Sequence, residues 1–303
     1  MKLSIIIVSW NVAGKLKENL KAIYFSDLEK SNFEVFVVDN NSEDDTVGIV
    51  RKEFPQVKLI VNFENFGFAK ANNQAIKQVK GEYILLLNPD MRVKNDTFKN
   101  MLKWMDENPQ ARVAGCKLVN ETGEIIKHVR CFPKILDQLA IVLKLPHIFP
   151  NILNKYLIND FDYEKQAKVD SIRGGFFLVR NNAAGTQNVE TQNLASLHIA
   201  FPKLKLDERY FLWFEEVDFC LQIKNASEEA WYTPAAECVD YVGQSFKQVD
   251  TAKKQKYFRD SQLKYFKKWH PAWQYYLLKI AWVFGVFILF VFKRMNFKSK
   301  AKT

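Results

Sequence analysis

The sequence has few of the residues that build zinc sites or redox pairs. Its 303 residues include only four cysteines and four histidines. No two cysteines form a C-x-x-C pair, and the histidines show no ligand spacing. Zinc-finger and thiol-redox proteins are therefore disfavoured, and scattered reduced thiols are typical of a cytosolic protein. The cysteines are Cys116, Cys131, Cys220 and Cys238.

A secretory signal is also missing from the N-terminus. One lysine precedes the apolar run Leu3–Val8, which is shorter than a signal-peptide core and is not followed by a small-residue cleavage site. The run is better explained as a buried first strand. We therefore expect the body of the protein to stay in the cytoplasm.

Acidic residues are scarce at the C-terminal end. Residues 247–303 hold 14 of the 44 lysines and arginines but only two of the 34 acids, so the net charge of +10 comes from this tail. The rest of the chain is near neutral. A basic tail suggests a polyanionic partner, either nucleic acid or the anionic face of a membrane.

Short apolar runs alternate with amphipathic stretches between residues 3 and 119. Runs without polar alternation are typical of strands buried on both faces of a parallel sheet. Their alternation with helical periodicity predicts an α/β fold with a mostly parallel central sheet and flanking helices. The expected strands are Leu3–Val8, Val35–Val38, Val57–Val61, Tyr83–Leu87 and Val113–Val119, and the expected helices are 16–24, Asp44–Phe54, Phe68–Val79 and Asp96–Glu107.

The pattern is less regular in the second half, where Gly174-Gly175 permits either close approach to a ligand or a bulge. The expected elements are short helices over 120–175, a strand at Ile172–Val179, a polar loop over 183–204, a helix at Phe219–Asn225, a strand or strand pair at Ala230–Val242 and a basic helix at Lys253–Trp269. We therefore divide the chain into a body, residues 1–250, and a C-terminal segment, residues 251–303.

Two of the predicted strands lead into aspartates. Ligands of such sheets bind at the carboxyl ends of the strands, so Asp39 and Asp90 are expected to share a crevice. Asp39 suits a hydrogen bond from the N–H of a pyrimidine base, although the polar turn after it, taken alone, is more typical of a helix cap. Asp90 suits a hard divalent cation that bridges diphosphate oxygens. The alternative is an ordinary turn at Pro89.

A further acidic group follows the aromatic residues of 210–214. Glu215, Glu216 and Asp218 open a predicted helix, where acids stabilise the helix dipole. The functional interpretation is that one of these acids takes a proton from an acceptor hydroxyl. Aromatic surroundings would raise the pKa of such a carboxyl group and make it a better base.

Taken in order, these segments resemble the inverting glycosyltransferases of family 2, which have the GT-A fold. The resemblance is greatest to the bacterial rhamnosyltransferase-type branch, which builds surface polysaccharides, and it covers residues 1–270. Each motif is weak alone, but the ordered set is specific. The matching segments are Ser4–Asn11, Val38–Thr46, Asn65–Asn73, Leu87–Asp90, Gly174–Phe177, Asp207–Asp218 and Gly243–Ser245.

The resemblance implies roles for individual residues. Asp39 matches the contact to the donor base, and Asp90 matches the last acid of the metal-binding D-x-D motif. Glu216, beside Glu215, matches the catalytic base. The remaining residues expected around the nucleotide sugar are Asn41, Asn65, Gly67, Asn72 and Asn88.

The sequence departs from the family pattern at four places. Asn88 replaces the first aspartate of D-x-D, and Glu216 replaces the usual aspartate base, which changes its reach by one methylene. Asp240 stands where a histidine near the metal is usual, so we expect Asp240 beside the metal. The 183–204 segment is longer than the family leads us to expect, on the acceptor side.

The resemblance implies a single in-line displacement with inversion at the anomeric carbon. Glu216 would deprotonate the acceptor hydroxyl, while Mg²⁺ or Mn²⁺ on Asp90 would stabilise the departing diphosphate. The donor would be a dTDP-, UDP- or GDP-linked sugar, with rhamnose as the family-level expectation. The acceptor would be a lipid-linked glycan or a polysaccharide of the cell surface.

The C-terminal segment fits a lipid-linked acceptor. Tyr275–Phe292 is apolar except for Lys279 and is at the lower limit of length for spanning a bilayer. Both flanks are basic, which one straight span cannot satisfy under the positive-inside rule. We therefore expect an interfacial or re-entrant helix that holds the protein at the cytoplasmic face of the cell membrane, on an anionic surface. A buried C-terminal core helix is the alternative.

Three other functions remain open. A sugar-phosphate nucleotidyltransferase usually has a Gly-rich, Arg-containing loop after its first strand, which Ser9–Gly14 does not supply. A membrane-docked, non-catalytic protein that binds nucleotide sugars is consistent with the substitutions at positions 216 and 240. Nucleic-acid binding is disfavoured, because the basic tail contains an apolar helix.

Overall fold

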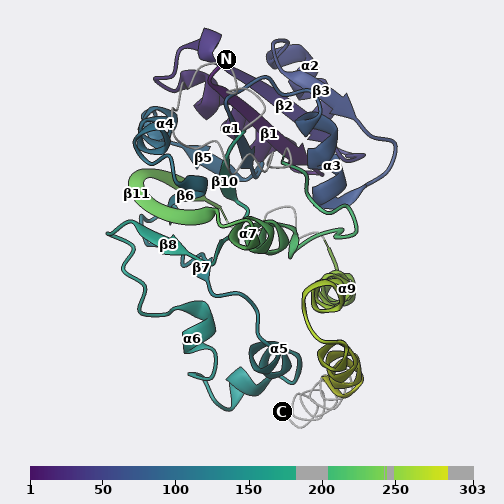
Figure 1. Cartoon of the computed structure of the whole chain (residues 1–303). Coiled ribbons are helices and arrows are strands. Elements are labelled where there is room, and N and C mark those ends of the chain that lie inside the picture. Colours follow the sequence, from purple (N-terminus) through teal and green to yellow (C-terminus); the bar gives the residue numbers. More distant parts are fainter. Residues whose placement is uncertain (182–203, 242, 244–248, 286–303) are drawn as a thin grey trace, which may run out of the picture.

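A curled sheet of nine strands forms the centre of the protein (Figure 1). The computed structural model describes residues 1–181, 204–241, 243 and 249–285, so nearly all of the expected 183–204 loop lies outside it. One half of the sheet is parallel. Its strands, in spatial order, are β3 (Lys58–Val61), β2 (Phe33–Asp39), β1 (Leu3–Ser9) and β4 (Tyr83–Leu87).

The other half of the sheet corrects the expectation of a mostly parallel sheet. β10 (Phe176–Arg180) runs antiparallel to both β4 and β6 (Ala111–Val119). β11 (Glu229–Asp240) is parallel to β6, but β5 (Met91–Val93) and β8 (Ala167–Val169) are antiparallel to β11. The antiparallel direction of β10 could not be predicted from the sequence, because β10 is buried on both faces and burial alone does not indicate the direction of a strand.

The helices expected in the first half are present, and they cover the sheet because alternate strand residues face opposite sides. Ile5 and Ile7 of β1 belong to one buried apolar cluster, whereas Ile6 belongs to the cluster on the opposite face. The helices are α1 (Ala13–Phe25), α2 (Thr46–Glu53), α3 (Gly67–Ile76) and α4 (Thr97–Glu107).

The middle of the chain is irregular, as expected. The expected strand at 172–179 is in fact two strands, β9 (Ser171–Ile172) and β10, separated by a turn at Gly174-Gly175. The turn replaces the bulge that was one alternative. The other short elements are β7 (Val129–Arg130), α5 (Ile135–Val142), α6 (Asn154–Leu157) and the 3₁₀ turns Lys30–Asn32 and Leu145–His147.

Three further helical segments lie in the second half of the chain. They are α7 (Glu215–Asn225), which precedes β11, α9 (Thr251–Trp269), and a helix over residues 272–285. The last two are neighbours, since the indole of Trp282 donates a hydrogen bond of 2.7 Å to Gln262. Both pack with α5 and the 210–214 segment in one apolar cluster. A domain boundary near residue 250 stays a prediction.

Across the described ranges 1–181, 204–241, 243 and 249–285, no helix combines the length and apolar character needed to cross a membrane.

Candidate active site

A cavity of about 500 Å³ opens where the carboxyl ends of β1 and β4 meet the start of α7. Because β1, β2 and β4 are adjacent and parallel, their carboxyl ends share one edge of the sheet, where α/β proteins bind their ligands. The predicted residues that line this cavity are Asn65, Gly67, Asn88, Asp90, Glu215 and Glu216.

One wall of the cavity is a turn held against the segment that leads into α7. The backbone N–H of Phe68 donates to the carbonyl of Phe211 at 2.7 Å. Gly67 has a φ of +78°, and a Cβ at that position would lie 2.3 Å from the Phe211 oxygen. Asn40 reinforces the wall, because its side-chain amide donates to the carbonyl of Gly67 at 3.1 Å. Only glycine fits this close approach between two distant segments.

Three residues expected at the nucleotide sugar do not line the cavity. Asp39 is buried, and its Oδ2 accepts from the backbone of Ser42 at 3.0 Å. Its buried Oδ1 has no hydrogen-bond partner within the described part of the chain. Asn41 is exposed, and Asn72 is buried within α3, where it donates to the carbonyl of Phe68 at 2.9 Å. Their roles stay predictions.

Two buried aspartates, Asp90 and Asp240, lie at adjoining ends of the paired strands β5 and β11, and Asp90 lines the cavity. Asp90 precedes β5, Asp240 ends β11, and the backbone N–H of Tyr241 donates to the carbonyl of Asp90 at 3.1 Å. Nη1 of Arg173 lies 3.2 Å from Oδ2 of Asp240. Arg173 also lines the cavity, and the sequence analysis missed it. Its one sequence signal was its position directly before Gly174.

The oxygens of Asp90 and Asn88 suit a cation that is held jointly by the protein and a diphosphate better than one held by protein ligands alone. Within the described residues, no cluster of three or more His, Cys, Asp or Glu is placed to hold a metal ion. Mg²⁺ and Mn²⁺ at nucleotide sites need only one or two protein carboxylates, because the diphosphate supplies other oxygens. Asp90 and Asn88, both lining the cavity, fit that arrangement. Asp240 already has an arginine beside it, and its metal role stays a prediction.

Glu215 and Glu216 line the cavity directly after a strained stretch of backbone. Trp213 and Phe214 have φ values of 63° and 71°, in the left-handed region that bulky residues rarely adopt. Such strain costs about 1–3 kcal/mol per residue and is concentrated at functional sites. Here the two strained residues lie directly before the first turn of α7, which lines the cavity. Glu216 lies beside the Gly174 turn, since a Cβ at Gly174 would be 3.7 Å from that of Glu216.

The surroundings of the two glutamates favour their protonated forms. Burial raises the pKa of Glu215 well above its ordinary value, and the neighbouring charge of Glu216 raises it further. Burial also raises the pKa of Glu216, although the positive charges of Arg130 and Arg173 act in the opposite direction. A carboxylate with a raised pKa is a stronger base once ionised. The raised pKa of Glu216 is therefore consistent with the base expected at this position, whose role stays a prediction.

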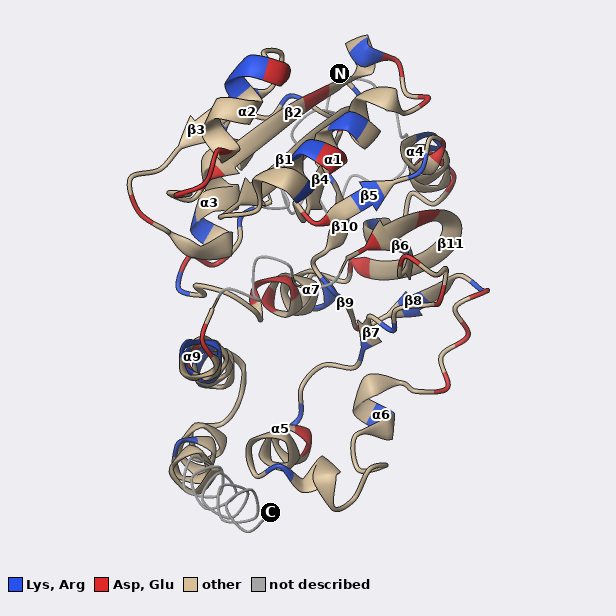
Figure 2. Ribbon diagram, turned by 180° about the vertical axis from the view of Figure 1, so that it is seen from behind, with Lys and Arg blue, Asp and Glu red and all other residues tan. Residues whose placement is uncertain are grey.

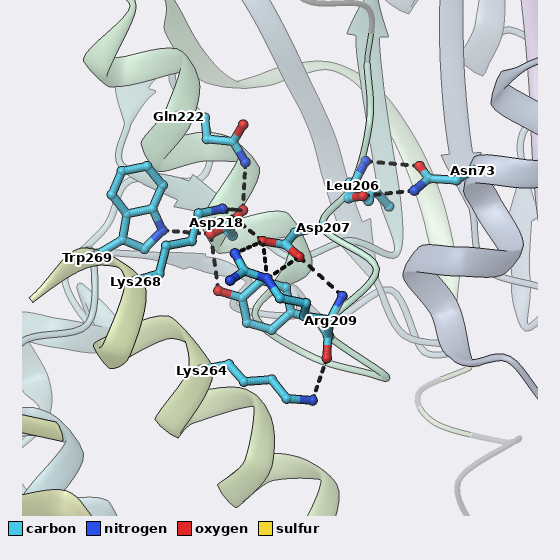
Figure 3. A network of polar contacts seen from close by, with 10 residues as sticks. Asn73, Leu206, Asp207, Arg209, Asp218, Gln222, Lys264, Lys268 and Trp269 are labelled. Atoms are coloured by element: carbon cyan, nitrogen blue, oxygen red, sulfur yellow. Dashed lines mark hydrogen bonds and ion pairs between the residues drawn. The ribbon is translucent and has the colours of Figure 1, made fainter. Parts of the chain in front are cut away.

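Asp218, the third acid of the motif, is not among the residues that line the cavity. Asp218 is fully buried and accepts a hydrogen bond from Tyr210 at 3.1 Å. It also accepts from Gln222 (2.6 Å), Lys268 (2.8 Å) and Trp269 (2.6 Å), and Figure 3 shows these three contacts. Lys268 and Trp269 lie at the end of α9, so Asp218 ties α9 to α7. The start of α9 also reaches the cavity through Asp250, Lys253 and Tyr257. No local sequence pattern indicated this contribution.

A mixed α/β fold with acidic residues at a strand-end cavity is typical of α/β proteins that bind a ligand at this edge of the sheet. The family described as "Glycosyl transferase family 2" matches residues 4–171, which is more than half of the chain. The chain belongs to this family. The family resemblance drawn from the sequence is therefore confirmed.

Two curated relatives extend the comparison. The chain is 26% identical over 238 residues to rhamnosyltransferase WbbL of Escherichia coli, covering 75% of this chain and 77% of that protein. It is 33% identical over 111 residues to poly(ribitol-phosphate) β-N-acetylglucosaminyltransferase TarS of Staphylococcus aureus. That alignment covers 36% of this chain and only 19% of TarS, so the similarity spans a small part of the longer protein.

A solved structure shares the fold. The mannosyltransferase PcManGT of Pyrobaculum calidifontis, solved with GDP-Man and Mn²⁺, superposes with a TM-score of 0.55 at 18% identity. The match covers 88% of this chain and 63% of PcManGT. At this identity the likeness concerns the fold alone.

Proposed function

We propose that the protein is an inverting glycosyltransferase that moves a sugar from a nucleotide-diphosphate donor to a lipid-linked or polysaccharide acceptor in cell-surface glycan synthesis. One observation carries the proposal: the carboxylates of α7, with raised pKa values, line the same cavity as Asp90 at the end of the parallel strands. Rhamnose is the first sugar to test, because WbbL is a rhamnosyltransferase.

The chemistry divides between the two sides of the cavity. Glu216 takes the proton of the acceptor hydroxyl, whose oxygen then attacks the anomeric carbon. The bond from that carbon to the diphosphate breaks, the diphosphate leaves with the electron pair, and the configuration inverts. Asp90 and Asn88 would hold Mg²⁺ or Mn²⁺, which when bound neutralises charge on the leaving diphosphate. The guanidinium of Arg173 adds a fixed positive charge on the same side.

The donor side is built from strand-end turns. Asp39, whose buried Oδ1 has no hydrogen-bond partner within the described residues, precedes Asn40, which binds Gly67. We expect this polar region to contact the base and ribose of a UDP-, dTDP- or GDP-sugar. PcManGT was solved with GDP-Man and Mn²⁺, which supports testing GDP-sugars and Mn²⁺ beside the other donors.

The deciding experiment measures nucleotide release from a panel of UDP-, dTDP- and GDP-sugars, with Mg²⁺ or Mn²⁺ and then with EDTA. The variants are Asp90→Ala and Glu216→Gln, with the exposed Glu121→Gln as the matched control. We expect turnover of one donor, lost with EDTA and in both site variants but kept in the control. Turnover that Glu216→Gln leaves unchanged would contradict the assigned base. Absence of turnover, together with absence of nucleotide binding in a separate binding measurement, would contradict the whole proposal.

A further inference from the structure

Residues 272–285 expose a continuous apolar face. The spacing of its residues follows a helical repeat of three and four, so they lie along one side of the helix. The opposite side is already used, because Leu278, Ala281 and Trp282 are buried against α9 and α5. The face, called here the docking face, consists of Trp273 (57% exposed), Tyr276 (60%), Leu277 (38%), Ile280 (56%), Val283 (70%) and Phe284 (58%).

The docking face lies at the end of the molecule away from the parallel half of the sheet. Figures 1 and 2 show α9 between α7 and the helix of residues 272–285. α5 lies beside this helix, because a Cβ at Gly285 would be 2.6 Å from the carbonyl of Val142. Leu136 of α5 is itself 76% exposed. A continuous exposed apolar face rimmed by polar residues is typical of a binding surface.

The charge around the docking face indicates which partner covers it. Residues 250–285 contain eight lysines and arginines but only two acids, Asp250 and Asp260. Lys279 is exposed within the helix itself, and Lys264 and Lys267 are exposed on the adjacent α9. A second copy of the chain would bring the same positive charge, so pairing of two such faces is opposed by repulsion. An anionic lipid surface supplies both the apolar and the negative component.

The composition of the docking face also fits the boundary of a bilayer. Tryptophan and tyrosine prefer the level of the lipid headgroups, where their polar groups stay hydrated, and long lysine side chains reach the same level. We propose that the docking face binds in the headgroup region of an anionic bilayer, with the helix of residues 272–285 lying in the membrane plane. This docking does not depend on the proposed reaction.

Docking would also fix the distance between the active site and the surface of the bilayer. Gln262 accepts from Trp282 and donates to Gln138 of α5 at 2.8 Å, while Lys268 and Trp269 bind Asp218 of α7. The docking helix is thus joined through α9 to the helix that carries Glu216. An acceptor held in the same bilayer would have to present its hydroxyl at the distance from the membrane that this linkage sets.

The test is flotation of the full chain with phosphatidylcholine vesicles, with and without phosphatidylglycerol. The variants are the double substitution Ile280→Asp/Phe284→Asp and the single Val283→Asp. Phe25→Asp, at a 74% exposed site on α1, is the matched control. We expect the wild type and the control to float with anionic vesicles. The double variant should lose at least about tenfold in bound fraction, and Val283→Asp should lose less, because buried apolar area sets interfacial affinity.

Three outcomes would overturn the proposal. The first is flotation of the double variant at the wild-type level, and the second is an equal loss in the control Phe25→Asp and in Val283→Asp. The third is a wild type that does not float and that sediments as a dimer which the double variant disrupts. All the altered side chains are largely exposed, so circular dichroism should show a folded protein in each case. Donor turnover in detergent is measured on the same samples, which separates failure of docking from failure of the proposed reaction.

Discussion

The guanidinium of Arg173 lies 3.2 Å from the carboxylate of Asp240, whose side chain is only 1% exposed. The contact joins the turn before β10 to the end of β11, beside Asp90. The family resemblance implies a histidine near the metal at this position, and from it we expected Asp240 beside the metal. This chain instead has an acid with an arginine beside it, so a fixed positive charge stands at the cavity.

Arg173→Met should lower the free energy of unfolding by about 1–3 kcal/mol, because it leaves a buried carboxylate without its guanidinium partner. The lower part of this range allows for the exposed third of the arginine side chain. The double variant Arg173→Met/Asp240→Asn should recover part of the loss. Urea unfolding measures both. Lys165→Met, which breaks the exposed pair with Asp162, is the control and should leave stability nearly unchanged. Equal effects at the two sites would contradict a structural role for the pair.

Glu215→Gln should stabilise the protein at high pH and not at low pH. The folded state raises the pKa of Glu215, so it binds the proton more tightly than the unfolded chain does. Stability from this group is therefore complete below the ordinary carboxyl pKa and is lost as the pH rises toward the folded pKa. Glutamine does not ionise, and we expect a Tm higher by about 2 °C or more near pH 8, with little difference near pH 4. Thermal melts across this range test the prediction, with Glu121→Gln as an exposed control. An equal rise in Tm near pH 4 and near pH 8 would refute the prediction.

Gly67→Ala should damage both stability and turnover. Its Cβ would lie 2.3 Å from the Phe211 carbonyl, at a φ of +78°. The two penalties together should cost about 3 kcal/mol or more and should displace the turn that walls the cavity. Gly123→Ala separates the causes, because Gly123 has a φ of +84° with open space around it. That variant should lose only about 1–2 kcal/mol. Similar urea midpoints for the two alanine variants would mean that the contact with Phe211 does not matter.

Lys268→Met should loosen α9 from α7. The ammonium group of Lys268 lies 2.8 Å from the fully buried carboxylate of Asp218. The loss should be about 1–3 kcal/mol, since Tyr210, Gln222 and Trp269 continue to donate to Asp218. As a positioning residue, Lys268 should affect kcat more than the KM of the donor.

Lys267→Met is the matched control, because the preceding lysine is exposed on the same helix. It should stay within about 0.5 kcal/mol of the wild type. Urea unfolding and steady-state kinetics are measured on both variants. A loss of stability in Lys268→Met without any change in kcat would limit its role to stability.

Local patterning was enough for most elements of the first half and for part of the site. β1, β2 and β4 are uninterrupted apolar runs, and α1 repeats Leu16, Leu20 and Ile23 on one face, so each element was visible from its own residues. The parallel order of these strands then brought Asn88 and Asp90 to one edge of the sheet. The acidic start of α7 was also visible, as a charged turn after aromatic residues.

Tertiary structure decided what depends on residues distant in the chain. The antiparallel direction of β10, the Arg173–Asp240 contact and the choice of Asp218 as the buried link to α9 are set by packing between separate elements. The same is true of the docking face, because the sequence showed an apolar helix but not which of its sides α9 would cover. Periodicity reports how a segment is buried, whereas direction, partner and exposed side follow from which elements meet in the folded chain.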